Sequence, residues 1–187
     1  MIRYAKLNRG FDFAASFLIV VVLVPLLLIL MLAIRAESKG SPIFVQKRLG
    51  IDKKPFNCLK LRTMYLTAPE ISFHQLPPNY ITKLGHFLRK SKLDELPQLI
   101  NVLRGDMSLV GPRPCLPSQD ILIREREELD VFQIKPGITG LAQIQGVGTE
   151  DASEQARLDK EYISTLSFLG DIKIFLITIC GRWKKSG

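Results

Sequence analysis

Two adjacent carboxylates, Asp94 and Glu95, are the residues best suited to chemistry, because basic residues lie close to them in the sequence. Arg89 precedes Asp94 by five positions, and Lys60 and Arg62 follow a predicted hairpin. Two carboxylates among cations suit a Mg²⁺ ion shared with phosphate oxygens, because Mg²⁺ prefers one or two protein carboxylates plus substrate ligands. The cations suit a diphosphate. The alternatives are a helix cap for the carboxylates and solvated surface charge for each basic residue.

Arg113 is a further phosphate-binding candidate, since it stands between Pro112 and Pro114. The two prolines restrict the backbone on both sides of the arginine. This restriction lowers the entropy lost when the guanidinium binds an anion. The tripeptide alone is weak evidence, and its value depends on the neighbouring carboxylates.

Other chemistries find little support in the sequence. His74 and His86 have no partner residues at ligand spacing, and no P-loop or Ser-His-Asp order is present. The cysteines form no CxxC pair and are odd in number, which argues against a disulfide framework or a zinc site. They are interpreted as reduced thiols.

The elements that must position the carboxylates are a hairpin and two helices. Apolar stretches at Ile43–Val45 and Phe56–Leu61 flank a turn rich in Gly, Asp and Lys, which predicts a small β-hairpin. Residues 65–80 are predicted to form a loop, and a helical period begins at Thr82. A second helix is expected to begin between Ser91 and Asp94 and to stop at Gly105. Pro97 then falls in its first turn, so the carboxylates would lie at the helix N-terminus.

The rest of the chain alternates loops and helices. Residues 105–117 are predicted to be irregular, residues 120–132 a charged helix, residues 135–148 a glycine-rich loop, and residues 150–166 another helix. The apolar end, followed by Trp183, Lys184 and Lys185, predicts a helix in a membrane interface, with a buried core helix as the alternative.

Residues 13–34 form an apolar run without a charge, about 33 Å long as a helix, which is close to the thickness of a bilayer core. Pro25 near its middle predicts a kink. Basic residues flank both ends, so the positive-inside bias does not favour a single crossing. A transmembrane anchor and a re-entrant helix that returns to the same face both remain open. A cleaved signal peptide is disfavoured, because the run is too long and lacks a cleavage site.

Composition indicates one folded domain beside the membrane segment. The chain has 187 residues and a net charge of +8 with a pI near 9.5. We expect a membrane helix with its flanks over residues 1–40 and a cytosolic domain over residues 41–187. The charge fits anionic lipid or phosphorylated substrates. Nucleic-acid binding is disfavoured, because no aromatic-basic motif is present and the N-terminus is apolar.

In order along the chain, the apolar run with Pro25, KLRTM at 60–64, RKSKLDELPQLINVLRGDMSLVGPRP at 89–114 and KPGITGLAQ at 135–143 resemble the bacterial monotopic phosphoglycosyl transferases. LDELPQ, GDMSLVGPRP and PGITGLAQ are together highly specific. The resemblance implies a monotopic membrane protein with α+β fold, mainly helical with a small hairpin, a re-entrant N-terminal helix bent at Pro25 and interfacial amphipathic helices. It places the protein on the cytoplasmic face of the bacterial inner membrane.

The family's reaction moves sugar 1-phosphate from a UDP-sugar to a polyprenol phosphate such as undecaprenyl phosphate, which gives a polyprenol diphosphate sugar and UMP at the start of surface glycan assembly. By this resemblance Asp94 is the nucleophile and forms a phosphoglycosyl aspartate. Glu95 would help hold Mg²⁺ or manage the acceptor's proton. The resemblance also implies substrate contacts, and the candidate residues are Lys60, Arg62, Arg89, Arg113 and Gln143.

Two departures from the family pattern affect these expectations. Val24 replaces a serine often found before the helix-breaking proline, so the bend loses one hydrogen-bonding support. Val147 stands where relatives frequently carry an arginine near the nucleotide, which leaves nucleotide contacts and sugar preference open. An inactive, basic, membrane-anchored scaffold or lipid-binding protein is the alternative function, although such a protein need not retain Asp94, Glu95 and Arg113 together.

Overall fold

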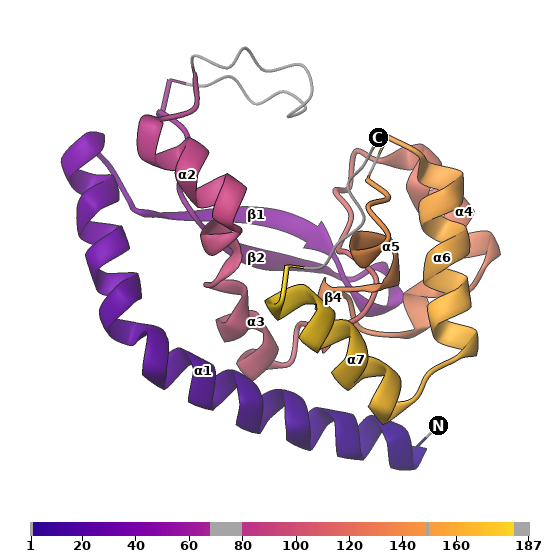
Figure 1. The fold of residues 1–187 in the computed structure, drawn as a ribbon. Helices are drawn as coiled ribbons and strands as arrows, with labels where there is room; N and C mark the ends of the chain where they lie inside the picture. Colours follow the sequence, from indigo (N-terminus) through magenta and orange to yellow (C-terminus); the bar gives the residue numbers. More distant parts are fainter. Residues whose placement is uncertain (1, 68–79, 149, 182–187) are drawn as a thin grey trace.

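The computed structural model describes residues 2–67, 80–148 and 150–181, with side chains from residue 8 onward. The chain folds as a mainly helical α+β protein with two small sheets, which confirms the predicted class (Figure 1). The α-helices are α1 (Ile2–Glu37), α2 (Lys83–Ser91), α3 (Gln98–Arg104), α4 (Asp120–Glu128), α5 (Leu141–Ile144), α6 (Ala152–Ser164) and α7 (Phe168–Ile179). The strands are β1 (Ile43–Leu49), β2 (Pro55–Leu61), β3 (Ser108–Val110) and β4 (Gly137–Thr139). Short 3-10 turns are η1 (Ile51–Lys53), η4 (Leu93–Glu95) and η5 (Val131–Gln133).

Strands β1 and β2 form the predicted antiparallel hairpin, and β1 extends beyond the expected Val45 to Leu49. Gln46 lies opposite Cys58 in the ladder. Directly opposed residues share a face, as do residues two apart on one strand. Arg48, Cys58 and Lys60 therefore share one face of the hairpin.

Strands β3 and β4 pair in parallel, whereas their segments were predicted to be irregular loops. A Cβ atom added at Gly137 would lie 2.1 Å from the backbone nitrogen of Gly111, so two glycines permit this close approach. Strands of three residues are too short to display the alternating pattern by which a strand is recognised in a sequence. The pairing brings GDMSLVGPRP beside KPGITGLAQ.

Helix α7 packs one face into the core, in line with the core-helix alternative, while its place in a membrane interface stays a prediction. Asp171 and Ile174 are buried, and Ile174 packs in the main core with Met107 and Leu109. The opposite side exposes Leu169, Leu176 and Ile179 to the surface. One face of the helix thus belongs to the core and the other is available to an apolar environment.

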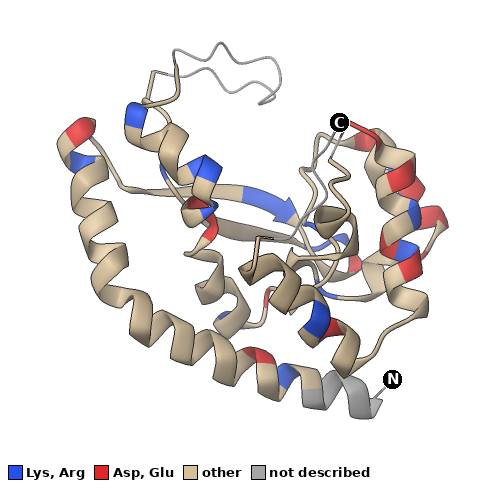
Figure 2. Ribbon diagram, in the orientation of Figure 1, with Lys and Arg blue, Asp and Glu red and all other residues tan. Residues whose placement is uncertain are grey.

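Helix α1 is long and apolar enough over Asn8–Glu37 to cross a membrane by length and composition, and it contains Pro25. It changes direction along its length in Figure 1, and Figure 2 shows its long middle stretch without charge. Nine of its large apolar side chains, from Phe13 to Leu32, are exposed.

Polar contacts hold both ends of α1 to the rest of the chain. Near the start, Asp12 accepts a hydrogen bond from the Ser108 hydroxyl at 2.6 Å, and the Arg9 guanidinium donates to the carbonyl of Leu103 at 2.9 Å. At the other end, the Glu37 carboxylate accepts the backbone N–H of Leu84 at 3.1 Å. Both ends therefore contact one body formed by β3, α3 and α2.

Candidate active site

The predicted dyad lies in the 3-10 turn η4, not in the first turn of an α-helix as expected. Lys92 adopts a left-handed conformation with φ of 60°, and α3 begins only after Pro97. In a continuous helix the ring of Pro97 would clash with the carbonyl of Leu93, which instead accepts the N–H of Leu96 at 3.3 Å. The helix end predicted at Gly105 is confirmed, with a left-handed cap. The carboxylates are thus presented on a short turn three or more residues before α3.

Glu95 is the centre of an ion-pair network. One of its oxygens, Oε1, accepts from the Arg113 guanidinium at 2.6 Å and from the Lys60 ammonium at 3.0 Å. Burial raises the pKa of Glu95, but the charges and hydrogen bonds of Arg113 and Lys60 outweigh burial and hold that pKa well below its usual range. Glu95 is therefore a stable anion that fixes two cations predicted from the sequence.

Asp94 differs sharply from its neighbour. Asp94 is 9% exposed. Its carboxylate has no hydrogen-bond or ion-pair partner among the residues that the structure describes. Burial, and then the charge of Glu95, raise the pKa of Asp94, while Lys60 and Arg89 oppose this rise. A buried carboxylate with open oxygens and raised basicity is suited to binding a ligand or to attacking an electrophile.

The structure places the remaining predicted residues differently. Arg89 lies close enough to Asp94 to feel its charge, and its Nε donates to the Thr63 hydroxyl at 2.8 Å. Arg62 donates to the carbonyls of Ser38 and Lys39 at 2.6 and 2.7 Å, so its guanidinium secures the chain after α1 and lies apart from the Glu95 network.

Gln143 and Pro25 likewise lie outside the network of Glu95. The Gln143 amide donates to the carbonyl of Ile138 at 2.9 Å, which ties it to β4. Pro25 lies inside α1. The structure thus brings Lys60, Arg89 and Arg113 to the dyad, whereas the described contacts of Arg62 and Gln143 lie elsewhere.

Two arginines that the sequence did not single out hold the backbone around Arg113. Arg126 of α4 donates to the carbonyl of Arg113 at 2.8 Å, and Arg48 of β1 donates to the carbonyl of Pro114 at 2.9 Å. Arg126 is itself paired with Asp159 of α6 at 2.6 Å, and both side chains are almost fully buried. Local sequence offers no signal for these contacts, because each joins residues from distant parts of the chain.

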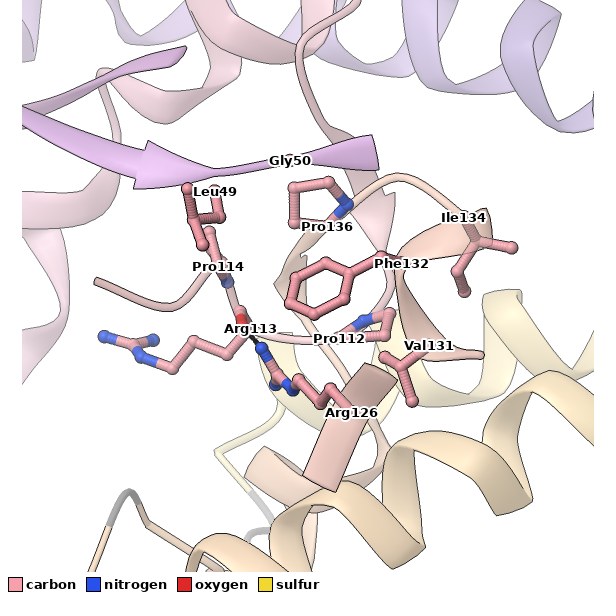
Figure 3. Close-up of a pocket in the computed structure, with 10 residues that line it drawn as sticks. All are labelled: Leu49, Gly50, Pro112, Arg113, Pro114, Arg126, Val131, Phe132, Ile134 and Pro136. Atoms are coloured by element: carbon pink, nitrogen blue, oxygen red, sulfur yellow. Dashed lines mark hydrogen bonds between the residues drawn. The ribbon is translucent and has the colours of Figure 1, made fainter. Parts of the chain in front are cut away.

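Apolar residues pack behind the same segment, which we call the Pro-Arg-Pro loop (residues 112–114). Figure 3 shows Phe132, Val131 and Pro136 on one side of the loop, and the Arg113 side chain pointing away from them. The carbonyl of Arg113 faces Arg126. The loop is therefore fixed from behind, and its guanidinium is directed toward Glu95.

The residues present fit a Mg²⁺ ion that is shared with substrate oxygens. Asp94 has both oxygens open, whereas one oxygen of Glu95 already carries two cations. No group of three or more His, Cys, Asp or Glu side chains occurs in the described ranges, so a cage made only by protein ligands is not seen there. A single carboxylate with phosphate oxygens is an arrangement that Mg²⁺ accepts.

Comparison with known proteins gives one consistent result. Residues 3–185 match the family described as bacterial sugar transferase. The chain is 43% identical over 181 residues to a UDP-glucose:undecaprenyl-phosphate glucose-1-phosphate transferase of Caulobacter vibrioides, covering 92% of this chain and 68% of the relative. It is 40% identical to a protein of the same description from Escherichia coli, and 35% identical to the undecaprenyl-phosphate galactose phosphotransferase of Salmonella typhimurium. These two matches cover 92% of this chain but only 39% of each relative.

Proposed function

Because the chain belongs to the bacterial sugar transferase family, we propose that it transfers a sugar 1-phosphate from a UDP-sugar to undecaprenyl phosphate. The products are an undecaprenyl diphosphate sugar and UMP, and the step would begin the assembly of a surface polysaccharide. The names of the relatives support this donor and acceptor. Those names include both glucose and galactose, so a panel of UDP-sugars is the appropriate donor set.

The observation that carries the mechanism is the open carboxylate of Asp94 beside a network of cations. We propose that an Asp94 oxygen attacks the phosphorus that bears the sugar. The bond from that phosphorus to the bridging oxygen breaks, and UMP leaves with the oxygen and its electron pair. An oxygen of undecaprenyl phosphate then attacks the same phosphorus, and the Asp94 carboxylate is released. The covalent intermediate lets one site use two large substrates in turn.

Glu95 acts in this proposal by orienting cations. A carboxylate whose pKa is held low is a weak base, which disfavours a role in accepting the acceptor's proton. Its Oε1 instead holds Lys60 and Arg113 together, and these cations would stabilise the negative charge of the transferring phosphoryl group.

Asp94 would hold a Mg²⁺ ion together with diphosphate oxygens, and the bound ion would supply further neutralisation of phosphoryl charge. The contribution of Glu95 to that ion would be limited to its second oxygen, because Oε1 already accepts from two cations. Arg89, whose charge interacts with Asp94, would contact the same phosphate in this proposal.

The membrane arrangement we propose is re-entrant, with the domain on the cytoplasmic face of the inner membrane. Arg9 and Asp12 bind α3 and β3, while Glu37 binds α2. A helix that crossed the bilayer would have to break the contacts at one end, because both ends are held by the same body. The exposed apolar face of α7 would lie in the membrane interface.

The decisive experiment incubates the enzyme with each UDP-sugar and Mg²⁺ but without acceptor, and then measures intact protein mass. We expect an added mass of one sugar phosphate on the wild type and none on Asp94→Asn, which preserves the shape of the side chain. Asp130→Asn is the matched control, because Asp130 is exposed in a different turn. An equal added mass on Asp94→Asn would refute the role of Asp94 as nucleophile. No added mass on the wild type and no UMP release with any donor would favour the alternative of an inactive scaffold.

A further inference from the structure

A small pocket lies beside the dyad and shares two of its cations. Its walls are Arg48, Cys58, Lys60, Gln98, Arg113 and Pro114. Lys60 and Arg113 also bind Glu95, so anything in the pocket would lie next to the dyad. Its open space is about 190 Å³ including the mouth. Much of this space is open to solvent at the mouth, so the pocket is shallow and could contact only one small chemical group.

Gln98 is the feature of the pocket that the fold does not explain. The residue is 3% exposed, yet its side-chain amide has no hydrogen-bond partner among the residues that the structure describes. Its amide atoms are not among those cut off from all contact with solvent, which agrees with its place in the pocket wall. A buried amide without a protein partner is unfavourable unless water or a ligand binds it, so its polar atoms point to a ligand or water in this space.

The charges around Gln98 determine what kind of ligand fits. Arg48, Lys60 and Arg113 are three cations on the walls, and the carboxylate nearest to them is Glu95, which binds two of the three. Arg48 is held in place by Gln46 at 2.7 Å and by the carbonyl of Pro114 at 2.9 Å. Preorganised cations with one amide donor favour an anion with several oxygens.

We propose that this pocket binds a phosphoryl group, with Gln98 and Arg48 as substrate contacts in addition to Lys60 and Arg113. The proposal rests on the proposed function, in which a diphosphate must place one phosphorus at Asp94 and a second phosphoryl group beside it. The departing phosphoryl group of UMP has this position, and the phosphate of the acceptor is the other source of the same chemistry. We assign the pocket to the departing group, because the donor presents two linked phosphoryl groups at once.

The test measures binding of UMP and of inorganic phosphate to the full chain in the presence of Mg²⁺. We expect Gln98→Leu to raise both dissociation constants at least tenfold by removing a hydrogen bond to a charged group. Gln98→Glu should raise them further through repulsion, and it keeps nearly the same shape. Gln155→Leu is the control, since Gln155 is also a buried glutamine on a helix but does not line the pocket.

Steady-state kinetics separate the two sources of phosphate. If Gln98→Leu lowers kcat/KM for the UDP-sugar and leaves kcat/KM for undecaprenyl phosphate unchanged, the pocket binds the departing phosphoryl group. If it lowers kcat/KM for the acceptor alone, that assignment is overturned. A Gln98→Leu variant that weakens UMP but not inorganic phosphate would mean a contact to the nucleoside and would overturn the phosphoryl site. Unchanged binding of UMP and of inorganic phosphate in both Gln98 variants would also overturn the phosphoryl site. The binding arm can be repeated in Asp94→Asn, so failure of the nucleophile does not affect its outcome.

Discussion

The guanidinium of Arg126 donates to the backbone carbonyl of Arg113 at 2.8 Å, and this bond joins a buried ion pair to the dyad. On one side Arg126 is paired with Asp159 at 2.6 Å. On the other, the side chain of Arg113 binds Glu95 at 2.6 Å. The position of a cation at the dyad thus depends on a carboxylate of α6, through one arginine and one backbone carbonyl.

Asp159→Asn is therefore expected to affect both stability and transfer. The substitution leaves the Arg126 charge buried without its partner, which destabilises a protein by about 3–5 kcal/mol. We also expect a lower kcat/KM for the donor, because the Pro-Arg-Pro loop is held less firmly. The measurements are chemical unfolding and UMP release.

A double variant separates the two effects. Arg126→Met with Asp159→Leu replaces the pair by apolar groups, and such replacements are often neutral for stability. It should recover stability but not activity, because the bond to the Arg113 carbonyl stays absent. Full activity in the stable double variant would contradict the positioning role. Glu154→Gln on the same helix is the control, since it removes an exposed pair with Arg157, which contributes little.

The pH dependence of adduct formation provides a second prediction. Asp94 must be ionised to attack, and in the site without metal its burial and the charge of Glu95 raise its pKa, so the rate should fall on acidification. Glu95→Gln removes the anion and leaves Lys60 and Arg113 facing Asp94. The acid limb should then move to lower pH, while the plateau falls because Arg113 has lost its anchor.

The measurement is the initial rate of UMP release without acceptor, followed across pH. Glu128→Gln, at an exposed position of α4, is the control and should leave the profile unchanged. An acid limb that stays in place or moves upward in Glu95→Gln would contradict the coupling between the two carboxylates.

The sequence predicted the parts of the site whose signals are local. The hairpin was recognisable from two apolar stretches around a polar turn, and Asp94, Glu95 and Arg113 were recognisable from their neighbours. The α-helical start at the dyad was wrong, because a left-handed Lys92 and the ring of Pro97 divide the segment into two elements.

The parts of the site that the sequence did not predict depend on contacts between distant segments of the chain. Arg126 lies in a helix whose charged pattern indicates a solvated face, yet it is buried because Asp159, 33 positions later, supplies its partner. Arg48 is one of several basic residues that follow the apolar run, and its role follows from the hairpin register and from Pro114. A local window contains neither partner, so no pattern within it distinguishes a buried arginine from an exposed one.

Metal dependence is the third prediction. We expect excess EDTA to abolish UMP release and added Mg²⁺ to restore it. Lys60 and Arg113 are paired with Glu95, so the negative charges of Asp94 and of the substrate diphosphate still require a cation. Mn²⁺ bound in the presence of UMP, followed by its magnetic resonance signal, gives a readout that does not need turnover. Asp94→Asn should weaken this binding more than Glu95→Gln, whose Oε1 already serves Lys60 and Arg113. Equal effects of the two variants would argue for joint ligation.

The fourth prediction concerns the two ends of α1, which we expect on the same side of the membrane. Gly10→Cys and Ser41→Cys place thiols at exposed positions on either side of the apolar stretch, and a Cβ at Gly10 meets no atom within 4 Å. The background is Cys180→Ser, because Cys180 is exposed while Cys58 and Cys115 are buried.

A membrane-impermeant maleimide should label both new thiols in inverted vesicles and neither in right-side-out vesicles. The physical reason is that Asp12 is bound to Ser108 and Glu37 to Leu84, so a crossing helix would leave a buried carboxylate and its partners unsatisfied at one end. Val22→Cys, in the exposed apolar part of α1, should be protected in both preparations. Labelling of Gly10→Cys from the opposite face to Ser41→Cys would mean that α1 crosses the bilayer, and that the contacts of Arg9 and Asp12 do not persist in the membrane.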